Sequence, residues 1–155
     1  MGRGAVQPRS ESARTDVVDK SLKFIGPGVD DTNRFFFDAT SNGQLAFQRC
    51  RLCATWWSLP AYACYACGAT EFDVVATSGR GSVHTYAIPR RPSAALIDED
   101  LVFVVIELDE GLRYFSRLVG IDPAAVNFGM RVEVQFAAAD SGVMVPVFAP
   151  AGAER

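Results

Sequence analysis

The sequence predicts a mainly β protein in which one short helix precedes a cysteine-rich ribbon and a small antiparallel barrel. Three observations lead to this prediction. All four cysteines fall between residues 50 and 67, as two Cys-x-x-Cys pairs. Short segments rich in β-branched and aromatic residues follow, and glycine-containing turns separate them. Before the cysteines, residues 31–41 form the segment that reads as a helix.

The composition is that of a folded domain. The chain has 155 residues, of which 49% are hydrophobic and 21% charged, which is typical of globular proteins. The formal net charge of -3 disfavours a nucleic-acid binder, because such proteins usually carry a basic excess. Residues 1–20 contain no apolar run of signal-peptide length, and no stretch approaches about 18 apolar residues. We therefore expect a cytoplasmic protein without a membrane helix, with reduced cysteines that favour metal binding over disulfides.

The predicted helix covers residues 31–41. Asp31 or Thr32 is expected to cap its start through a side-chain oxygen, and the Asn-Gly pair at 42–43 is expected to end it. The phenylalanines at 35–37 fan around such a helix, so they cannot all face one core. Phe36 is therefore a candidate for contact with a partner protein.

The strongest signal is the cysteine segment. Residues 44–49 alternate apolar and polar side chains, as a half-buried strand does, and lead directly into the first cysteine. Two Cys-x-x-Cys pairs give four converging thiolates, which suits tetrahedral zinc. The linker of ten residues between the pairs is short, which indicates a compact, rubredoxin-like ribbon. Gly68 directly follows the second pair, at a position where a tight turn favours a residue without Cβ. The predicted ligands are Cys50, Cys53, Cys64 and Cys67.

Structural zinc is the preferred occupant, with rubredoxin-type iron and a redox dithiol or disulfide as alternatives. Four thiolates leave no open coordination position for a substrate. The metal is therefore expected to be structural, replacing the core that so small a segment cannot build.

Six segments after the cysteines read as strands. They cover residues 72–77, 82–88, 101–108, 112–119, 131–136 and 143–148. Residues 109–111 look like a hairpin tip, and Asp122-Pro123 looks like the capped start of a short helical turn. Five strands with one short helical interruption fit a small barrel of the OB type. We predict an arm at residues 1–29, helix plus zinc ribbon at 30–70, an OB-fold barrel at 71–150 and a tail at 151–155.

Few other residues suggest chemistry. His84 is the one histidine, and its strand would place it on a face with Ser82 and Tyr86. The sequence puts neither a nucleophile nor an orienting carboxylate beside it, so a structural or surface role is expected. Residues 74–97 contain no acidic side chain but carry three arginines, Arg80, Arg90 and Arg91. Such a patch can bind phosphate, although solvated loop charge is the favoured explanation.

Trp56 and Trp57 lie inside the ribbon. Adjacent residues of an extended chain point to opposite sides, so one can cover the metal core while the other anchors a partner. The alternative is that both simply pack against the ribbon.

Several motifs in order resemble a known family. They are FFFDA, GQLAFQRCRLC, CYACG, SGRGSVHTY, VVIELDEG, RLVGIDP, FGMRVEVQF and VPVFAP, and they run from about Asn33 to Pro150. The chain is identified as a member of the bacterial and archaeal proteins that join a helix and a rubredoxin-like zinc ribbon to an OB-fold, long filed as a domain of unknown function.

The resemblance implies a role as accessory subunit, without catalysis of its own. Family members associate with thiolases and with lipid-transfer-type aldolases acting on acyl-CoA, including steroid side-chain aldolases, and some are linked to hot-dog-fold hydratases. The expected partner is such a thiolase-fold protein in steroid or lipid degradation, with acyl-CoA as a further ligand. The expected phosphate or CoA contacts are Arg80, Arg90 and Arg91, and the expected partner interface contains Phe36, Trp56 and Trp57.

This sequence departs from the family at two places. Many members carry a Pro-Pro-Arg-like stretch before the second cysteine pair, where this chain has Leu59, Pro60 and Ala61, so a phosphate contact by that arginine does not transfer. His84 stands where similar proteins often have an aromatic residue. Two other functions remain: a single-stranded nucleic-acid binder using the OB barrel, and a rubredoxin-like electron carrier.

Overall fold

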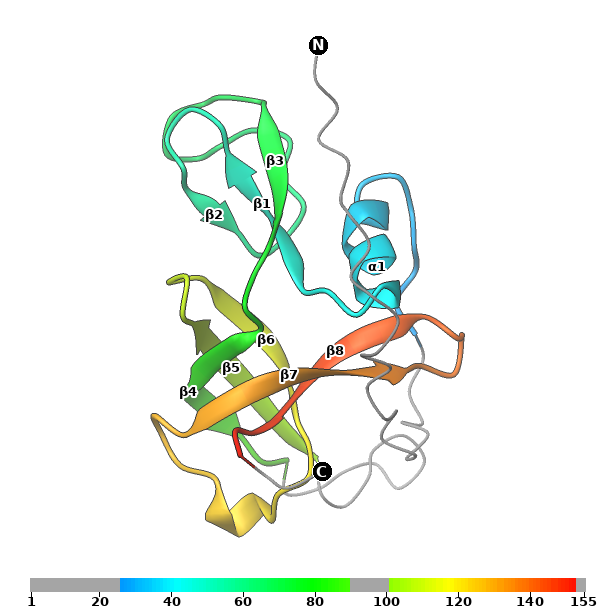
Figure 1. Ribbon diagram of the computed structural model, residues 1–155, viewed down its shortest axis with the longest axis vertical. Helices are drawn as coiled ribbons and strands as arrows, with labels where there is room; N and C mark the ends of the chain where they lie inside the picture. The colour runs from blue at the N-terminus through cyan, green and yellow to red at the C-terminus, as the bar shows by residue number, and fades with distance from the viewer. Residues whose placement is uncertain (1–25, 90–100, 153–155) are drawn as a thin grey trace.

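The structure, a computed structural model, describes residues 26–89 and 101–152, and Figure 1 shows the arrangement of its elements. One helix and a small sheet lie at one end of a β-barrel. The order along the chain is α1 (Arg34–Ser41), β1 (Ala46–Cys50), β2 (Trp56–Trp57), β3 (Phe72–Ala76), β4 (Arg80–Ala87), β5 (Val102–Leu108), β6 (Arg113–Leu118), the 3-10 helix η1 (Pro123–Ala125), β7 (Arg131–Ala138) and β8 (Met144–Pro150).

The ribbon is a three-stranded sheet in which β1 is central and pairs antiparallel with β2 and β3. The run of six strands predicted after the cysteines therefore divides. The first of them, β3, joins the ribbon, because β2 has only two residues and β1 needs a second partner along its five-residue length. The remaining five strands form the barrel.

The barrel confirms the predicted OB-type architecture. Its strand order is β4-β5-β6-β8-β7, closed by pairing of β4 with β7. The seam between β6 and β8 is parallel and short, with Leu118 opposite Phe148. The buried Ser116 hydroxyl donates a hydrogen bond of 2.8 Å to the carbonyl of Pro146 and so ties these two strands together.

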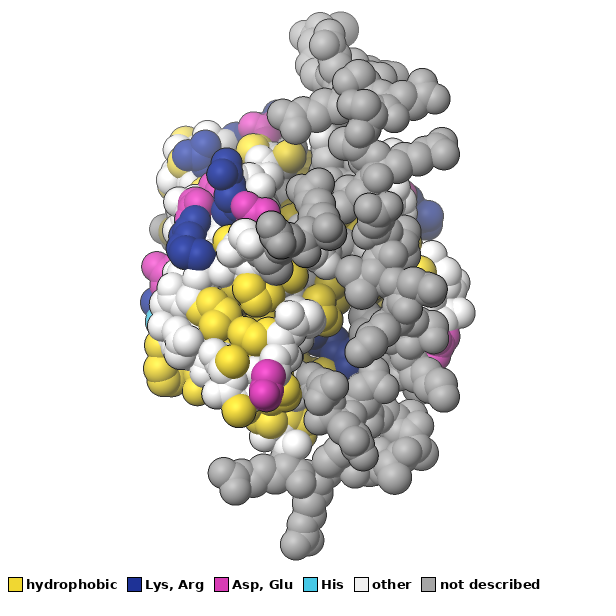
Figure 2. All heavy atoms as spheres, turned by 60° about the horizontal axis from the view of Figure 1, so that its bottom comes forward, with side chains coloured by type: hydrophobic (Ala, Val, Ile, Leu, Met, Phe, Trp, Pro, Cys, Tyr) yellow, Lys and Arg dark blue, Asp and Glu magenta, His cyan; other side chains and the backbone are white. Residues whose placement is uncertain are grey.

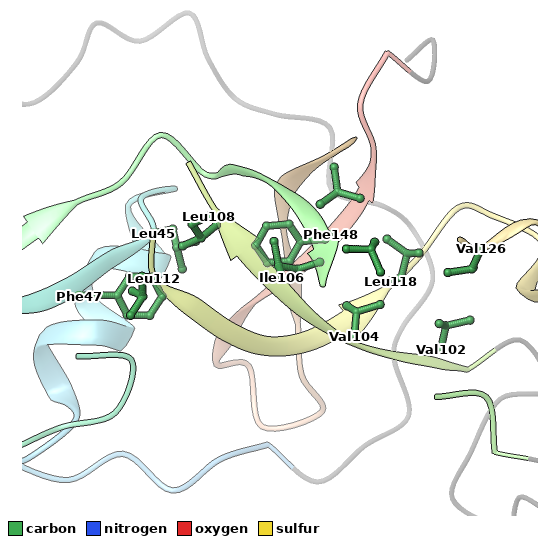
Figure 3. Packing of buried hydrophobic residues seen from close by; sticks show 12 residues of the cluster. Leu45, Phe47, Val102, Val104, Ile106, Leu108, Leu112, Leu118, Val126 and Phe148 are labelled. Carbon is green, nitrogen blue, oxygen red and sulfur yellow. The ribbon is translucent and has the colours of Figure 1, made fainter. Parts of the chain in front are cut away.

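The ribbon and the barrel share one core. Burial alternates along β5, so that Val104, Ile106 and Leu108 point into the barrel. Leu45 and Phe47, from β1 and the residue before it, belong to the same buried cluster. Figure 3 shows these two side chains beside those of the β5–β6 hairpin. The ribbon is therefore packed onto the barrel and not tethered by a linker alone.

Helix α1 begins three residues later than predicted. Asp31 and Thr32 do not cap it; its N-cap is Asn33, which makes no side-chain capping bond. Asp30 instead accepts the backbone N–H groups of Thr32 and Asn33 at 2.8 and 3.2 Å, in a turn that precedes the helix. The carboxylate that best reaches these amides lies outside the helix, which is why the prediction of the cap was wrong.

The phenylalanines of the helix point in different directions, as predicted from their adjacent positions. The Phe36 ring packs toward the barrel, with ring centroids 5.7 Å from Phe47 and 6.0 Å from Tyr114. Phe37 lies edge-on to Phe36. Phe36 is thus half-buried within the chain, and its contact with a partner stays a prediction.

Replacing Thr40 by Val is expected to loosen the helix from the barrel. The buried Thr40 hydroxyl lies 2.8 Å from the Met144 carbonyl and 3.0 Å from that of Phe37. Valine keeps the shape but leaves the Met144 carbonyl without this donor, which costs about 1–2 kcal/mol of unfolding free energy. Chemical denaturation measures the loss, and Thr40→Ser, which keeps the hydroxyl, should recover part of it.

Several predictions fall outside the described residues. Most of the N-terminal arm, Arg90 and Arg91, and the end of the C-terminal tail are among them. Across residues 26–89 and 101–152, no helix has the length and apolar character needed to span a bilayer.

Candidate metal centre and surrounding surface

The four cysteine sulfurs converge at one end of the ribbon. Their Sγ atoms all lie within 4.8 Å of one another. Cys50 and Cys67 are 3.6 Å apart and Cys53 and Cys64 are 3.5 Å apart, measured between Sγ atoms. Four thiolates about 2.3 Å from a common zinc would lie about 3.8 Å from each other. The donor set and its spacing therefore fit a single tetrahedral metal ion.

Two matching backbone turns present these sulfurs. In the first, the N–H of Ala54 bonds to the Cys50 carbonyl at 2.9 Å; in the second, the N–H of Gly68 bonds to the Cys64 carbonyl at 2.7 Å. Both turns need a left-handed residue just after the second cysteine. Gly68 has φ 76° and Ala54 has φ 60°, so the first turn places a side chain where the second has none.

Replacing Ala54 by Gly is expected to stabilise the protein by about 0.5–1 kcal/mol, because glycine adopts positive φ without the steric penalty of Cβ. The reciprocal change, Gly68→Ala, should destabilise it by about 1 kcal/mol. Thermal unfolding of the metal-loaded proteins measures both. A destabilised Ala54→Gly variant would show that the Ala54 methyl group makes a contact worth more than the backbone strain.

Hydrogen bonds favour the thiolate form at two of the cysteines. The Thr55 hydroxyl, 3.1 Å from the sulfur, and the Thr55 backbone amide lower the pKa of the Cys53 thiol to about 6. At the buried Cys64, burial raises the pKa but the amides of Ala66 and Cys67 outweigh it, and the pKa is lowered. Both thiols therefore lose their proton more readily than an ordinary cysteine, which favours the binding of a cation.

The fourth thiol resists ionisation. The Ala69 amide lowers the pKa of Cys67, but burial and the other three cysteine sulfurs outweigh this effect and raise the pKa to about 12. Four negative sulfurs so close together repel one another unless a cation lies between them. The cluster therefore has the charge distribution of a metal centre, and not that of four independent thiols.

The two tryptophans face opposite sides, as predicted. Trp56 packs against the core that the ribbon shares with the barrel, and the Arg49 guanidinium lies 5.3 Å from its ring centroid. Trp57 contacts Tyr65 and Phe72 in edge-on arrangements within the ribbon, and its buried indole N–H has no hydrogen-bond acceptor in the described part of the chain. Both rings are half-buried, so their role in a partner interface stays a prediction.

An open cleft of about 590 Å³ lies between the ribbon and the tip of the β5–β6 hairpin. The ribbon contributes Trp57, Leu59 and Tyr65, and the hairpin contributes Glu107, Leu112 and Arg113. Trp56 also lines the cleft, so both tryptophans of the expected partner interface lie there. The signal in the sequence that could have identified Leu59 and Tyr65 is the number of aromatic and aliphatic residues in the short cysteine segment.

Arg80, which is the predicted phosphate contact within the described residues, does not line this cleft. Arg80 is exposed at the start of β4. The pKa of Asp109 is lowered mainly by its hydrogen bonds with Arg131 and, to a smaller extent, by the charge of Arg80. Arg131 holds Asp109 through two bonds of 2.8 and 2.9 Å. The binding of phosphate or CoA by Arg80, Arg90 and Arg91 stays a prediction.

His84 has the carboxylate neighbour that its sequence did not reveal. Its Nδ1 lies 3.4 Å from a Glu107 carboxylate oxygen, and Arg113 lies 3.4 Å from the same oxygen. A β-bulge between Val83 and Thr85 breaks the alternation of β4, so His84 does not share a face with Tyr86. The carboxylate comes from a neighbouring strand, so the sequence around His84 could not reveal it, and the expected structural or surface role stays a prediction.

A helix, a four-cysteine ribbon and a closed five-stranded barrel on one core define a ribbon-plus-OB-fold protein. The family described as ChsH2, C-terminal OB-fold domain, matches residues 74–137. A solved structure, the Ltp2-ChsH2(DUF35) aldolase, is 34% identical with a TM-score of 0.74, and the match covers 81% of this chain and 99% of that chain. The chain belongs to this DUF35 family of ChsH2-like OB-fold proteins.

Curated relatives include subunits and scaffolds. A probable enoyl-CoA hydratase alpha subunit of Thermomonospora curvata is 34% identical over 91% of this chain and 44% of its own length. A DUF35 domain-containing scaffold protein of Methanocaldococcus jannaschii is 34% identical over 57% of this chain and 64% of its own. The 3-oxo-4,17-pregnadiene-20-carboxyl-CoA hydratase alpha subunit of Mycobacterium tuberculosis is 28% identical over 82% of this chain and 40% of its own. The chain thus spans 40% to 64% of these relatives.

Proposed function

We propose that this protein is an accessory subunit that binds and supports a thiolase-fold partner, a lipid-transfer-type aldolase or thiolase acting on acyl-CoA. Steroid side-chain or lipid degradation is the corresponding setting. The observation that carries the proposal is the 34% identity across 99% of a chain of the Ltp2-ChsH2(DUF35) aldolase. A match over nearly the whole of that chain includes the ribbon as well as the barrel.

The chemistry of the described residues supports an auxiliary role. The four cysteines form a closed donor set, which leaves no coordination position for a substrate. The His84–Glu107 pair is exposed, and in the described part of the chain no hydrogen bond joins its imidazole to a hydroxyl or a thiol. A nucleophile activated by a base needs such a bond. Catalytic groups would therefore belong to the partner.

The surface of the ribbon also supports a protein partner. Four of its large apolar side chains are exposed: Leu52, Leu59, Tyr62 and Tyr65. Apolar side chains gathered on a small domain mark an interaction site more often than a free surface. Nucleic acid is disfavoured by the net charge of -3 and by the barrel aromatics Phe103 and Phe115, which stack on each other at 5.6 Å.

We infer that the metal is zinc. Four thiolates at tetrahedral spacing suit zinc, which keeps the ribbon folded and takes no part in redox chemistry. The purified protein is expected to contain about one zinc per chain by elemental analysis. A red preparation with a visible absorption band would identify iron instead and would support the electron-carrier function.

A hydratase is the second candidate partner. Two relatives are named as alpha subunits of hydratases, and this chain corresponds to less than half of each. The ribbon-plus-OB unit could then serve a hydratase in the same way as an aldolase, through protein contacts without catalytic residues of its own.

Isolation of the tagged full-length protein from its native host, with mass spectrometry of the co-purified proteins, tests the function. A thiolase-fold or lipid-transfer protein recovered near one to one is the expected result, and acyl-CoA cleavage should need both chains. A hydratase in its place would favour the second candidate. Recovery of RNA or of nucleic-acid enzymes would reject both.

A further inference from the structure

The cleft between the ribbon and the β5–β6 hairpin is lined by large apolar groups. Trp57 and Tyr65 form a contact of 4.8 Å between ring centroids on the ribbon side, and Leu112 is buried on the barrel side. At the edge, Leu59 and Tyr65 are 72% and 78% exposed. A cleft of about 590 Å³ with such a lining has the size and chemistry to accept a large apolar side chain.

A cation stands beside this apolar lining. The Arg113 side chain is 59% exposed and its Nε lies 3.4 Å from Glu107. Within residues 26–89 and 101–152, its other two guanidinium nitrogens have no partner. Glu107 is meanwhile shared with His84. Arg113 therefore has free donors in the geometry that a carboxylate accepts.

The outer face of the β5–β6 hairpin carries further exposed apolar groups beyond Arg113. Arg113 and Phe115 are two residues apart on β6 and so point to the same face. Phe115 is 62% exposed and stacks on Phe103 of β5, with ring planes 21° apart. We use the name cleft surface for the lining of the cleft together with the outer face of the β5–β6 hairpin, whose strands Figure 1 shows below the ribbon.

The charges and rings of this surface select its occupant. A nucleic-acid strand needs free ring faces for base stacking and a basic groove, whereas Phe103 and Phe115 cover each other and Glu107 adds a negative charge. A polypeptide segment can offer an apolar side chain to the cleft and a neighbouring carboxylate to Arg113. The exposed apolar side chains of the ribbon and of β6 also suit a protein partner better than a small ligand.

We propose that the cleft surface is a docking site for a segment of the partner protein that carries a large apolar side chain next to an acidic residue. The apolar side chain inserts between Trp57 and Leu112, and the carboxylate binds Arg113. That this partner is a thiolase-fold protein rests on the proposed function; the chemistry of the docked segment does not.

The cysteine site builds the ribbon side of this docking site. Tyr65 directly follows Cys64, and β2 begins three residues after Cys53. A hydrogen bond of 2.9 Å from the Cys50 amide to the Thr55 carbonyl holds the start of β2 against the first turn. The shape of the cleft therefore depends on both pairs of cysteine ligands.

Selection of peptides tests the proposal without a known partner. A phage-displayed library of random 12-residue peptides is selected on the metal-loaded full chain, and the affinities of the enriched peptides are measured by fluorescence. Trp56 and Trp57 are the only tryptophans of the chain and both line the cleft, so they report binding. Enriched peptides are expected to pair a large apolar residue with Asp or Glu.

Arg113→Glu and Leu59→Ser are expected to weaken peptide binding about tenfold or more, because each removes an anchor of the docked segment. Phe128→Ser is the matched control: Phe128 is 68% exposed and packs on Tyr86, outside the cleft lining. Figure 2 shows the end of the barrel opposite the ribbon, where hydrophobic side chains also gather. Peptides without acidic residues, or equal binding by wild type and Arg113→Glu, would overturn the proposal.

Competition separates this proposal from the proposed function. A purified thiolase-fold partner is expected to displace the peptide. If it binds the chain and leaves the peptide in place, the docking site is wrong and the accessory role stands. If it does not bind while the peptide does so through Arg113, the docking site stands and the assigned partner is wrong.

Discussion

Replacing Cys64 by Ser is expected to remove the metal and unfold the ribbon. Cys64 is 2% exposed, and its carbonyl and amide also hold the second turn, through Gly68 and Ala69. Structural zinc contributes about 10 kcal/mol of apparent binding free energy to such small domains, so the ribbon has no comparable source of stability without it. Elemental analysis should show loss of bound metal, and hydrogen exchange should show loss of amide protection between residues 50 and 76.

The barrel is expected to outlast the ribbon in this variant, with lower stability. Its five strands close on themselves, but Leu45 and Phe47 of the ribbon belong to its core. Leu52→Ser is the matched control, because Leu52 lies between Cys50 and Cys53 and is 75% exposed. Full metal content and unchanged ribbon protection in Cys64→Ser would refute the assignment of this cysteine as a ligand. A strong chelator should reproduce the effect of the substitution on the wild type.

Replacing Gly81 by Ala is expected to destabilise the barrel by about 3 kcal/mol. A Cβ at this position would lie 2.5 Å from the Glu107 carbonyl oxygen, 2.8 Å from Ile106 Cγ2 and 3.0 Å from Leu108 Cα. Two of these atoms are backbone of the neighbouring strand, so relief requires β4 and β5 to separate. Urea denaturation followed by far-UV circular dichroism measures the loss.

Gly28→Ala is the control for this prediction, because nothing lies within 4 Å of the Cβ it would add. Its unfolding free energy should stay within about 0.5 kcal/mol of the wild type. A Gly81→Ala protein as stable as this control would mean that β4 and β5 can separate at little cost in free energy. The close strand approach would then not explain why this position of the SGRGSVHTY motif is a glycine.

Local signals in the sequence were sufficient for most elements. Turn chemistry is such a signal: Asp122 accepts the Ala124 amide at 2.8 Å and Pro123 begins η1, as their order predicted. The hairpin after β5 also forms where expected, with Gly111 bonded to the Leu108 carbonyl. These features depend on residues a few positions apart, so their cause is visible in the chain.

Non-local contacts account for the errors. The strand at residues 72–76 has the composition of any β-strand, and only its pairing with β1 assigns it to the ribbon. The carboxylate beside His84 comes from residue 107, across a bulge that no local pattern announces. The cleft likewise combines residues 55–65 with residues 107–113.

The amino-acid sequence alone was enough to single out the four cysteines that converge, the order of helix, ribbon and barrel, and the family. Cysteine spacing, turn residues and alternating hydrophobicity are local properties that can be recognised without knowledge of the fold. The tertiary structure was needed for the shared core around Phe47, the opposite environments of Trp56 and Trp57, and the position of Arg113 beside the cleft. These features arise where the ribbon packs on the β5–β6 hairpin, about fifty residues away along the chain, and packing over such distances depends on complementary shapes that no short sequence pattern encodes.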